Sequence, residues 1–156
     1  MPSKKDVQRI SFHYLQKFSF SNRTLAKTIV LRILREAGLK AENISYVFCS
    51  DEYLLNINRH HLEHDYYTDI ITFDLSERKG AVIADVYVSV DRVRENASEF
   101  NKSFQDELLR VIFHGALHLA GLGDKSPRQQ ARMRAAEERY LRMFHKQAHV
   151  PRDTVS

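Results

Sequence analysis

Two histidines four residues apart are the side chains of this chain that are best placed for metal chemistry. His114 and His118 lie in an apolar run, and histidines at positions i and i+4 of a helix project from the same face. Asp124 follows after Gly121 and Gly123, which would end the helix and let the backbone reverse. Zinc accepts imidazole and carboxylate ligands, and three protein ligands leave a fourth position open, as in catalytic sites. The pattern therefore predicts a catalytic metal site at His114, His118 and Asp124.

Two other interpretations of these residues have to be weighed. In the first, the histidines hydrogen-bond to carbonyl groups in the core, and Asp124 caps a helix end without binding a metal. In the second, the spacing His-x3-His-x2-Gly-x2-Asp places the chain near the metzincin peptidases. In HExxH metalloproteases a glutamate follows the first histidine as general base, and here that position is Gly115. The sequence therefore argues against a peptidase and leaves the packing interpretation open.

The helix that carries the histidines is expected to be buried, because its residues are apolar on nearly every side. The run extends from Phe104 to about Ala120, with Ser103 as its predicted cap and Gly121 as its end. Spacings of three and four residues place its few polar side chains on a single stripe. This stripe consists of Glu107, Arg110, His114 and His118.

Around this helix the sequence predicts an α+β fold in a single domain, residues 1–156, with a frayed tail at 148–156. Runs of alternating or β-branched residues indicate four strands, at 10–14, 44–50, 70–75 and 81–90, with a turn at 77–80. Helical periodicity and capping residues indicate five helices, at 22–37, 51–61, 91–100, 104–120 and from Ser126 onward. Since strands and helices do not alternate regularly, we expect a small mixed sheet of about four strands packed with about five helices, including a zincin-like metal helix.

Composition excludes a membrane or disulfide-stabilised protein. No apolar run approaches the roughly 20 residues of a membrane helix, and no apolar segment follows the N-terminal lysines as in a secretory signal. The single cysteine, Cys49, rules out an internal disulfide and is expected to be a small buried side chain. These features predict a cytoplasmic protein without a membrane partner.

Charge is distributed unevenly along the chain, whose net charge is +4. Residues 1–40 carry nine basic and two acidic side chains, and residues 125–156 carry eight and three. Residues 41–124 carry seven basic and fifteen acidic side chains. Basic ends around an acidic centre suit a polyanion bound at the periphery and a cation bound in the middle, although solvated helix faces would give the same pattern.

Three blocks of the sequence resemble the YbeY family, the bacterial endoribonucleases of ribosomal RNA maturation and quality control. HGALHLAGLGD (114–124) lies without a gap on the family's zinc motif HGxLHLxGYDH, and Met133 and Glu137 fall where the family has Met and Glu after the third ligand. LNINRHHLEHDYYTDIITF (55–73) resembles LNRxYRxKDxPTDVLSF, and IADVYVSVDRV (83–93) resembles GDIVISVDTV. The second block has Asn58, Arg59, Asp65, Thr68, Asp69 and Phe73 in register.

The resemblance implies a zinc-dependent, single-strand-specific endoribonuclease that acts on ribosomal RNA in ribosomal particles, with no DNA substrate expected. Metal binding carries over to His114, His118 and Asp124, with nickel or iron as other ions that suit these ligands. The family's third ligand is usually histidine, so Asp124 leaves less positive charge on the metal and predicts a weaker Lewis acid. The resemblance also implies a catalytic arginine that steadies the phosphate, and in this chain Arg59 is the substitute for it.

This sequence departs from the family next to that arginine. Leu62 replaces the second arginine of NRxYR, so Arg59 and the nearby His60, His61 and His64 are the positive or titratable groups there. Of these, His61 and His64 are expected to be ordinary exposed loop residues. The loss of an arginine and the absence of a clear general base favour an alternative function, a ribosome-associated RNA-binding or assembly factor with a structural metal and little turnover.

Overall fold

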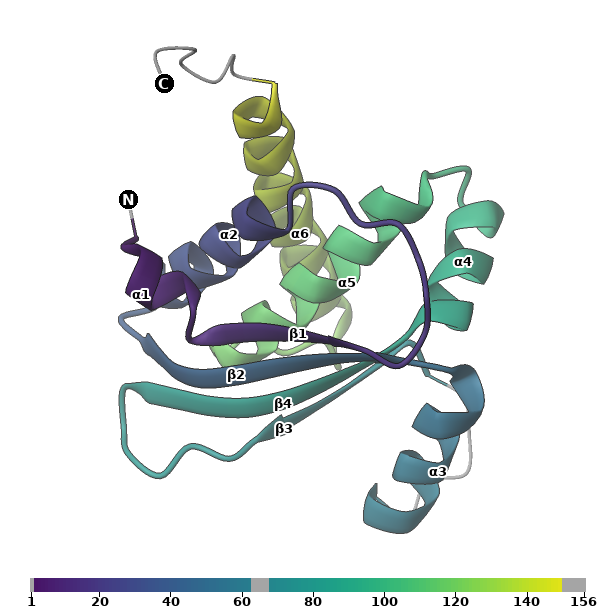
Figure 1. Ribbon diagram of the computed structural model, residues 1–156, viewed down its shortest axis with the longest axis horizontal. Helices are drawn as coiled ribbons and strands as arrows, with labels where there is room; N and C mark the ends of the chain where they lie inside the picture. Colours follow the sequence, from purple (N-terminus) through teal and green to yellow (C-terminus); the bar gives the residue numbers. More distant parts are fainter. Residues whose placement is uncertain (1, 63–67, 150–156) are drawn as a thin grey trace.

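A four-stranded mixed sheet forms the framework of the fold (Figure 1). The computed structural model describes residues 2–62 and 68–149. The strand order is β1-β2-β4-β3, in which β1, β2 and β4 are parallel and β3 is antiparallel to β4. The strands are β1 (Ile10–Tyr14), β2 (Lys40–Cys49), β3 (Ile70–Asp74) and β4 (Ala81–Ser89). The expected α+β class and the expected mixed sheet of four strands are confirmed.

Helices cover both faces of this sheet unequally. Figure 1 shows α2, α5 and α6 together on one side of the sheet and α3 on the other. The helices are α1 (Lys4–Val7), α2 (Arg23–Glu36), α3 (Asp51–Leu62), α4 (Val90–Glu99), α5 (Phe104–Leu119) and α6 (Pro127–Ala148). Five of them were expected from the sequence, whereas α1 was not, although the capping box formed by Ser3 and Asp6 is a local signal for it.

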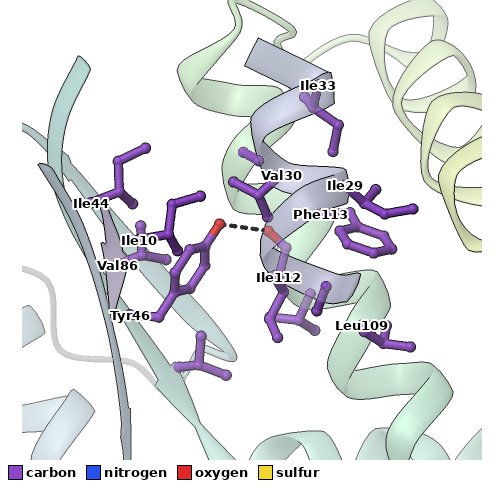
Figure 2. Close-up of a cluster of buried hydrophobic side chains, with 14 of the residues drawn as sticks. Ile10, Ile29, Val30, Ile33, Ile44, Tyr46, Val86, Leu109, Ile112 and Phe113 are labelled. Atoms are coloured by element: carbon purple, nitrogen blue, oxygen red, sulfur yellow. Dashed lines mark hydrogen bonds between the residues drawn. The ribbon is translucent and has the colours of Figure 1, made fainter. Parts of the chain in front are cut away.

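Helix α5 is the central helix of the core, as its apolar residues predict. It contacts α2, α4, α6 and the strands β3 and β4, and nine of its residues are buried. Inward-facing residues of β2 and β4 alternate with outward-facing ones along each strand, so that one face of the sheet packs against α5 and α2. Figure 2 shows part of this core, in which the Tyr46 hydroxyl donates a hydrogen bond to the Ile112 carbonyl at 3.0 Å.

The α3 side of the sheet holds a second, smaller apolar cluster. Cys49 is fully buried there with Leu54 and Ile71, and burial, with a smaller contribution from Asp91 and Asp51, raises the pKa of the Cys49 thiol to about 12. The expectation of a small buried cysteine is therefore confirmed. Among residues 2–62 and 68–149, no helix is both long and apolar enough to cross a membrane.

Element boundaries differ from the sequence-based expectation where tertiary pairing decides them. Strand β2 begins at Lys40 and not at residue 44, because residues 40–43 pair with the start of β4 through a bulge. Helix α4 begins at Val90 with Ser89 as its cap, one residue earlier than expected. The expected turn at 77–80 joins β3 and β4. Of the tail expected to fray, residues 148–149 continue from α6, and residues 150–156 lie outside the described residues.

Candidate metal centre

The last turns of α5 and the loop that follows bring His114, His118 and Asp124 together. The Nε2 atom of His114 lies 3.5 Å from the Oδ2 atom of Asp124, and the Nε2 atom of His118 lies 3.2 Å from the same oxygen. One possible ligand atom from each residue lies within 4.8 Å of the other two. The carboxylate therefore returns beside both imidazoles, as the sequence predicted, and the three side chains form a group that can hold one metal ion.

Two glycines shape this return in different ways. Gly121 has a φ of 105°, a left-handed conformation that side chains disfavour, and it directly follows the last turn of α5. Gly123 has no such requirement, but a Cβ atom there would lie 3.0 Å from the side chain of Gln129. The Gln129 Oε1 atom accepts hydrogen bonds from the backbone of Lys125 and Ser126. Gly123 thus lets the loop pass close to the start of α6.

The second nitrogen of each imidazole is held by a hydrogen bond that leaves Nε2 directed at Asp124. The Nδ1 atom of His118 donates to the Leu122 carbonyl at 2.8 Å. A carbonyl can only accept, so in the neutral ring Nδ1 carries the proton and Nε2 presents a lone pair. The Nδ1 atom of His114 lies 2.5 Å from the Oε2 atom of Glu137, the carboxylate–histidine arrangement that orients metal ligands. The packing interpretation is met at the Nδ1 atom of His118, which bonds to a carbonyl. It is not met by Asp124, because Ser126 caps α6 and the Asp124 carboxylate lies instead at the Nε2 atom of His118.

A buried ionic network lies behind the histidines. The Arg110 guanidinium bonds to Glu107 at 2.6 Å, to Glu137 at 3.3 Å and to Asp69 at 3.5 Å. Glu107 and Glu137 are 2% and 4% exposed. Burial alone would lower the pKa of Arg110, but the hydrogen bond to Glu107 and the other carboxylates raise it. Because three carboxyl groups surround one cation next to the histidines, the field at the site favours a bound cation.

Sequence analysis did not identify this network as part of the site. Two signals pointed to it: Glu107 and Arg110 share the polar stripe of the histidines, and Glu137 matches a position of the family pattern. The sequence could not show that α6 would pack against α5 so as to bring Glu137 to His114, because the two residues are 23 positions apart.

A cavity of about 510 Å³ opens in front of the histidines. Strand β3 supplies much of one wall, and the remaining lining comes from α3, the α5 end and Asp124. No lysine or arginine is among the described residues that line it, whereas three aspartates are. The lining residues are Asn58, Thr68, Asp69, Ile70, Ile71, Thr72, Asp74, His114, His118, Leu119 and Asp124.

Asn58, Thr68 and Asp69 of the block at 55–73 line this cavity, whereas Arg59, His60 and His61 do not. Arg59 is exposed on α3, and the neighbouring Asn58, which is buried, is the α3 residue that lines the cavity. His60 and His61 are exposed as well, but in the last turn of α3 and not in a loop. His64 and Asp65 lie outside the described residues, as does the side chain of Leu62.

Gly115 marks a close approach of α5 to the sheet. A Cβ atom at this position would lie 2.9 Å from the Cδ1 atom of Ile70 and 3.3 Å from the Cγ1 atom of Val86. The position that carries the general base of HExxH peptidases is therefore pressed against β3 and β4. A glutamate there would have to displace the side chains of Ile70 and Val86.

We expect Gly115→Glu to lower the free energy of unfolding by about 3 kcal/mol or more, since it both overpacks the core and buries a charge. Denaturant unfolding followed by circular dichroism measures the change. Ala135→Glu on the exposed face of α6 is the control, and it should change the stability by less than about 0.5 kcal/mol. Equal stability of the two variants would contradict the close approach.

Comparison with known proteins agrees with the resemblance of the three sequence blocks. The family profile described as endoribonuclease YbeY matches residues 10–145. The endoribonuclease YbeY of Cytophaga hutchinsonii is 44% identical over 125 residues, which is 80% of this chain and 87% of the relative. That of Porphyromonas gingivalis is 50% identical over 74% of this chain and 76% of the relative, and that of Flavobacterium psychrophilum is 40% identical over 87% and 96%.

The fold also has a counterpart among solved structures. A protein of Thermotoga maritima, determined in solution, superimposes with a TM-score of 0.58 at 25% sequence identity. The match covers 93% of this chain and 96% of that protein.

Proposed function

The chain belongs to the endoribonuclease YbeY family, and from this premise we propose that it is a metal-dependent endoribonuclease that cuts single-stranded RNA. We place its substrate in ribosomal RNA and ribosomal particles, where maturation and quality control require such cuts. The observation that carries the proposal is the convergence of His114, His118 and Asp124 on one point at the edge of a cavity. A second copy of this arrangement does not occur among the described residues.

Zinc fits this donor set best. Two imidazole Nε2 atoms and one carboxylate oxygen would hold three positions of a tetrahedral ion, which would leave one position for water or substrate. When bound, such an ion lowers the pKa of a water ligand to about 7 and takes up charge from a phosphoryl oxygen. Nickel or iron would be held by the same atoms. The protein's own contribution is to fix the rings through Glu137 and the Leu122 carbonyl.

Asp69 supplies a carboxyl group that can accept a proton beside the site. It lines the cavity and contacts Arg110 at 3.5 Å. Burial raises the pKa of Asp69, against the opposing effect of Arg110. A carboxylate with a raised pKa is a stronger base than an ordinary aspartate, which is what removal of a proton from an attacking water needs. We therefore assign to Asp69 the general-base role for which the sequence offered no clear residue.

Asp69→Asn should lower kcat about 100-fold or more, because a positioned general base contributes about 10²–10⁴-fold. In the wild-type protein the rate should fall as the pH is lowered through the raised pKa of Asp69, since only the deprotonated carboxylate accepts a proton. The variant should lack this acidic limb while binding the same amount of metal. A pH–rate profile and metal analysis of both proteins check these two points. An unchanged acidic limb in Asp69→Asn would contradict the assignment of Asp69 as the general base.

The proposed activity is tested by incubating the purified protein with single-stranded and duplex RNA of the same sequence, with zinc and with a chelator. We expect cleavage of the single strand, loss of cleavage on chelation and recovery when zinc is added back. An RNA-cleaving activity of the pure protein that persists in chelator would contradict the proposal.

The alternative, an RNA-binding or assembly factor with a structural metal, is favoured by the exposed position of Arg59 and by the acidic lining of the cavity. The comparison of wild type with Asp124→Ala distinguishes the two functions. An enzyme predicts a folded Asp124→Ala protein that binds RNA as well as wild type and does not cut it. A structural metal predicts an unfolded variant and no cleavage by either protein.

A further inference from the structure

The cavity beside the metal site cannot supply the affinity for RNA by itself. Its described lining contains three aspartates and no lysine or arginine, so it repels the phosphate backbone wherever a metal does not offset the charge. Affinity for an RNA strand comes mainly from cations that neutralise phosphates. The protein must therefore hold the strand by basic side chains outside this cavity.

A second cavity, of about 520 Å³, has the opposite character. It lies between α1, α2, the start of β2 and the end of α6, and it shares no residue with the first cavity. Five basic and two acidic side chains line it, which leaves a surplus of three positive charges. We propose that this cationic cavity is a second RNA-binding site, which holds a nucleotide of the same strand at a distance from the metal centre; the inference rests on the proposed function.

Only some of the charged side chains that line this cavity have hydrogen-bond or ion-pair partners within the described part of the protein. Arg78 pairs with Glu42 at 2.8 Å, and Arg9 donates to the Glu42 carbonyl. The Asp6 carboxylate accepts a hydrogen bond from the Ser3 backbone N–H, and the Asp6 backbone N–H donates to the Ser3 hydroxyl, which completes the α1 cap. Arg35 and Lys40 remain at the rim, where both are exposed. They are placed to contact a phosphate that enters from solvent.

Arg32 shows more directly that an acceptor is missing. Its Nε atom is buried and has no hydrogen-bond partner among the described residues. The nearest carboxylate, Glu36, is 3.9 Å away and already accepts hydrogen bonds from Tyr140 and Arg139. A buried donor without a partner is costly. The Arg32 side chain as a whole is 41% exposed, so a phosphate of a bound strand can contact its guanidinium group.

The floor of the cavity suits a base. Ile29 is buried there, and Leu39 and Met143 are partly buried against the same core. Ligand sites of about 300–1,000 Å³ with an apolar lining and a few charged groups are typical of pockets for small molecules of nucleotide size. A cationic rim with an apolar floor therefore matches a nucleotide, with its phosphate at the arginines and its base inside.

Helix α6 connects the two cavities along the outside of the molecule. It starts three residues after Asp124, and Met143 near its other end lines the cationic cavity. At 1.5 Å per residue, Pro127 and Met143 are about 24 Å apart, a distance that about seven stacked nucleotides cover at roughly 3.4 Å each. Its exposed side carries a basic stripe at spacings of four, seven, three and four residues, opposite its buried side. The stripe consists of Arg128, Arg132, Arg139, Arg142 and Lys146.

The inference is tested with Arg32→Gln/Arg35→Gln, compared with Arg134→Gln/Lys102→Gln, which removes the same charge from exposed positions outside the cavity. Both pairs are made in full-length protein carrying Asp124→Ala, so that RNA is not consumed. Binding of a 20-nucleotide single-stranded RNA and of a tetranucleotide, too short to span α6, is measured by fluorescence anisotropy at several salt concentrations. Thermal unfolding verifies that all variants are folded.

We expect the cavity variant to bind the 20-nucleotide RNA about 25-fold more weakly at ~0.1 M salt, with a salt slope smaller by about 1.4, because each lost phosphate contact removes about 0.7 from the slope. The tetranucleotide should lose affinity as well, because the cationic cavity alone can hold it, whereas the control variant should show no such change. Unchanged binding of the long RNA would overturn the inference, and so would an equal loss of affinity in the control variant. If wild type binds long RNA as expected and never cuts it, the proposed function fails and the binding site stands.

Discussion

We expect replacement of His118 by alanine to lower the rate of RNA cleavage by about 1,000-fold or more and to leave the fold intact. The ring is only partly buried, with 29% of its side chain exposed, so its loss removes a ligand without a large cavity. A metal that stabilises transition-state charge contributes several kcal/mol, and about 4 kcal/mol corresponds to a factor of about 1,000 in rate. Initial rates with single-stranded RNA, at saturating zinc and at equal protein concentration, measure the effect.

His149→Ala is the matched control for this experiment, because His149 is an exposed histidine at the end of α6, distant from the site in the sequence and outside its lining. Its cleavage rate should equal that of wild type within a factor of two. A folded His118→Ala protein that keeps a tenth or more of the wild-type rate would show that this ring is not a ligand of a catalytic ion.

The second large effect is expected at Glu137, which joins the ionic network to the metal centre. Glu137→Ala leaves the partly buried guanidinium of Arg110 with one partner fewer and His114 without the group that orients it. Removing one member of a fully buried ion pair costs about 3–5 kcal/mol, and the partial exposure of Arg110 places the expected loss at or below the lower end of this range. Removing a group that orients a metal ligand lowers metal affinity about 10–100-fold. We therefore expect one substitution to lower both the stability and the affinity for zinc.

Glu138→Ala provides the matched control, since Glu138 is the next residue of α6 and is exposed. Denaturant unfolding and zinc titration of both variants measure the two effects. Glu137→Gln should restore part of the zinc affinity, because its amide oxygen can still accept from the Nδ1 atom of His114. If Glu137→Ala matched Glu138→Ala in stability and zinc binding, the ionic network would have no role at the site.

Local spacing was sufficient to predict the three-residue group and most of the secondary structure. Histidines four apart on a helix share a face regardless of the rest of the fold, and Gly121 supplies the φ of 105° that the reversal needs. The capping box at Ser126 and Gln129 likewise fixes the start of α6 from local sequence. These features are determined by interactions between residues that are close in the sequence.

The remaining features depend on contacts between distant segments, which periodicity does not specify. The packing of α6 on α5 brings Glu137 to His114, and side chains of β3 and β4 leave little space for a Cβ atom at Gly115. Similarly, the resemblance to the family singled out Arg59, whereas the rotation of α3 directs Asn58 toward the cavity. The cationic cavity is lined by residues from the N-terminus to Gln147. The composition showed that both ends of the chain are basic, but it could not show that residues from both ends line one cavity.

The most direct test of metal binding by His114, His118 and Asp124 is to measure how much zinc the wild-type protein and Asp124→Ala bind. Equilibrium dialysis and elemental analysis give the stoichiometry and affinity after both proteins are shown to be folded. The account predicts one tightly bound zinc per wild-type chain and an affinity at least about 100-fold weaker in Asp124→Ala, since two imidazoles alone leave a tetrahedral ion with too few protein ligands. One equally tight zinc in both proteins would show that the carboxylate does not hold the metal.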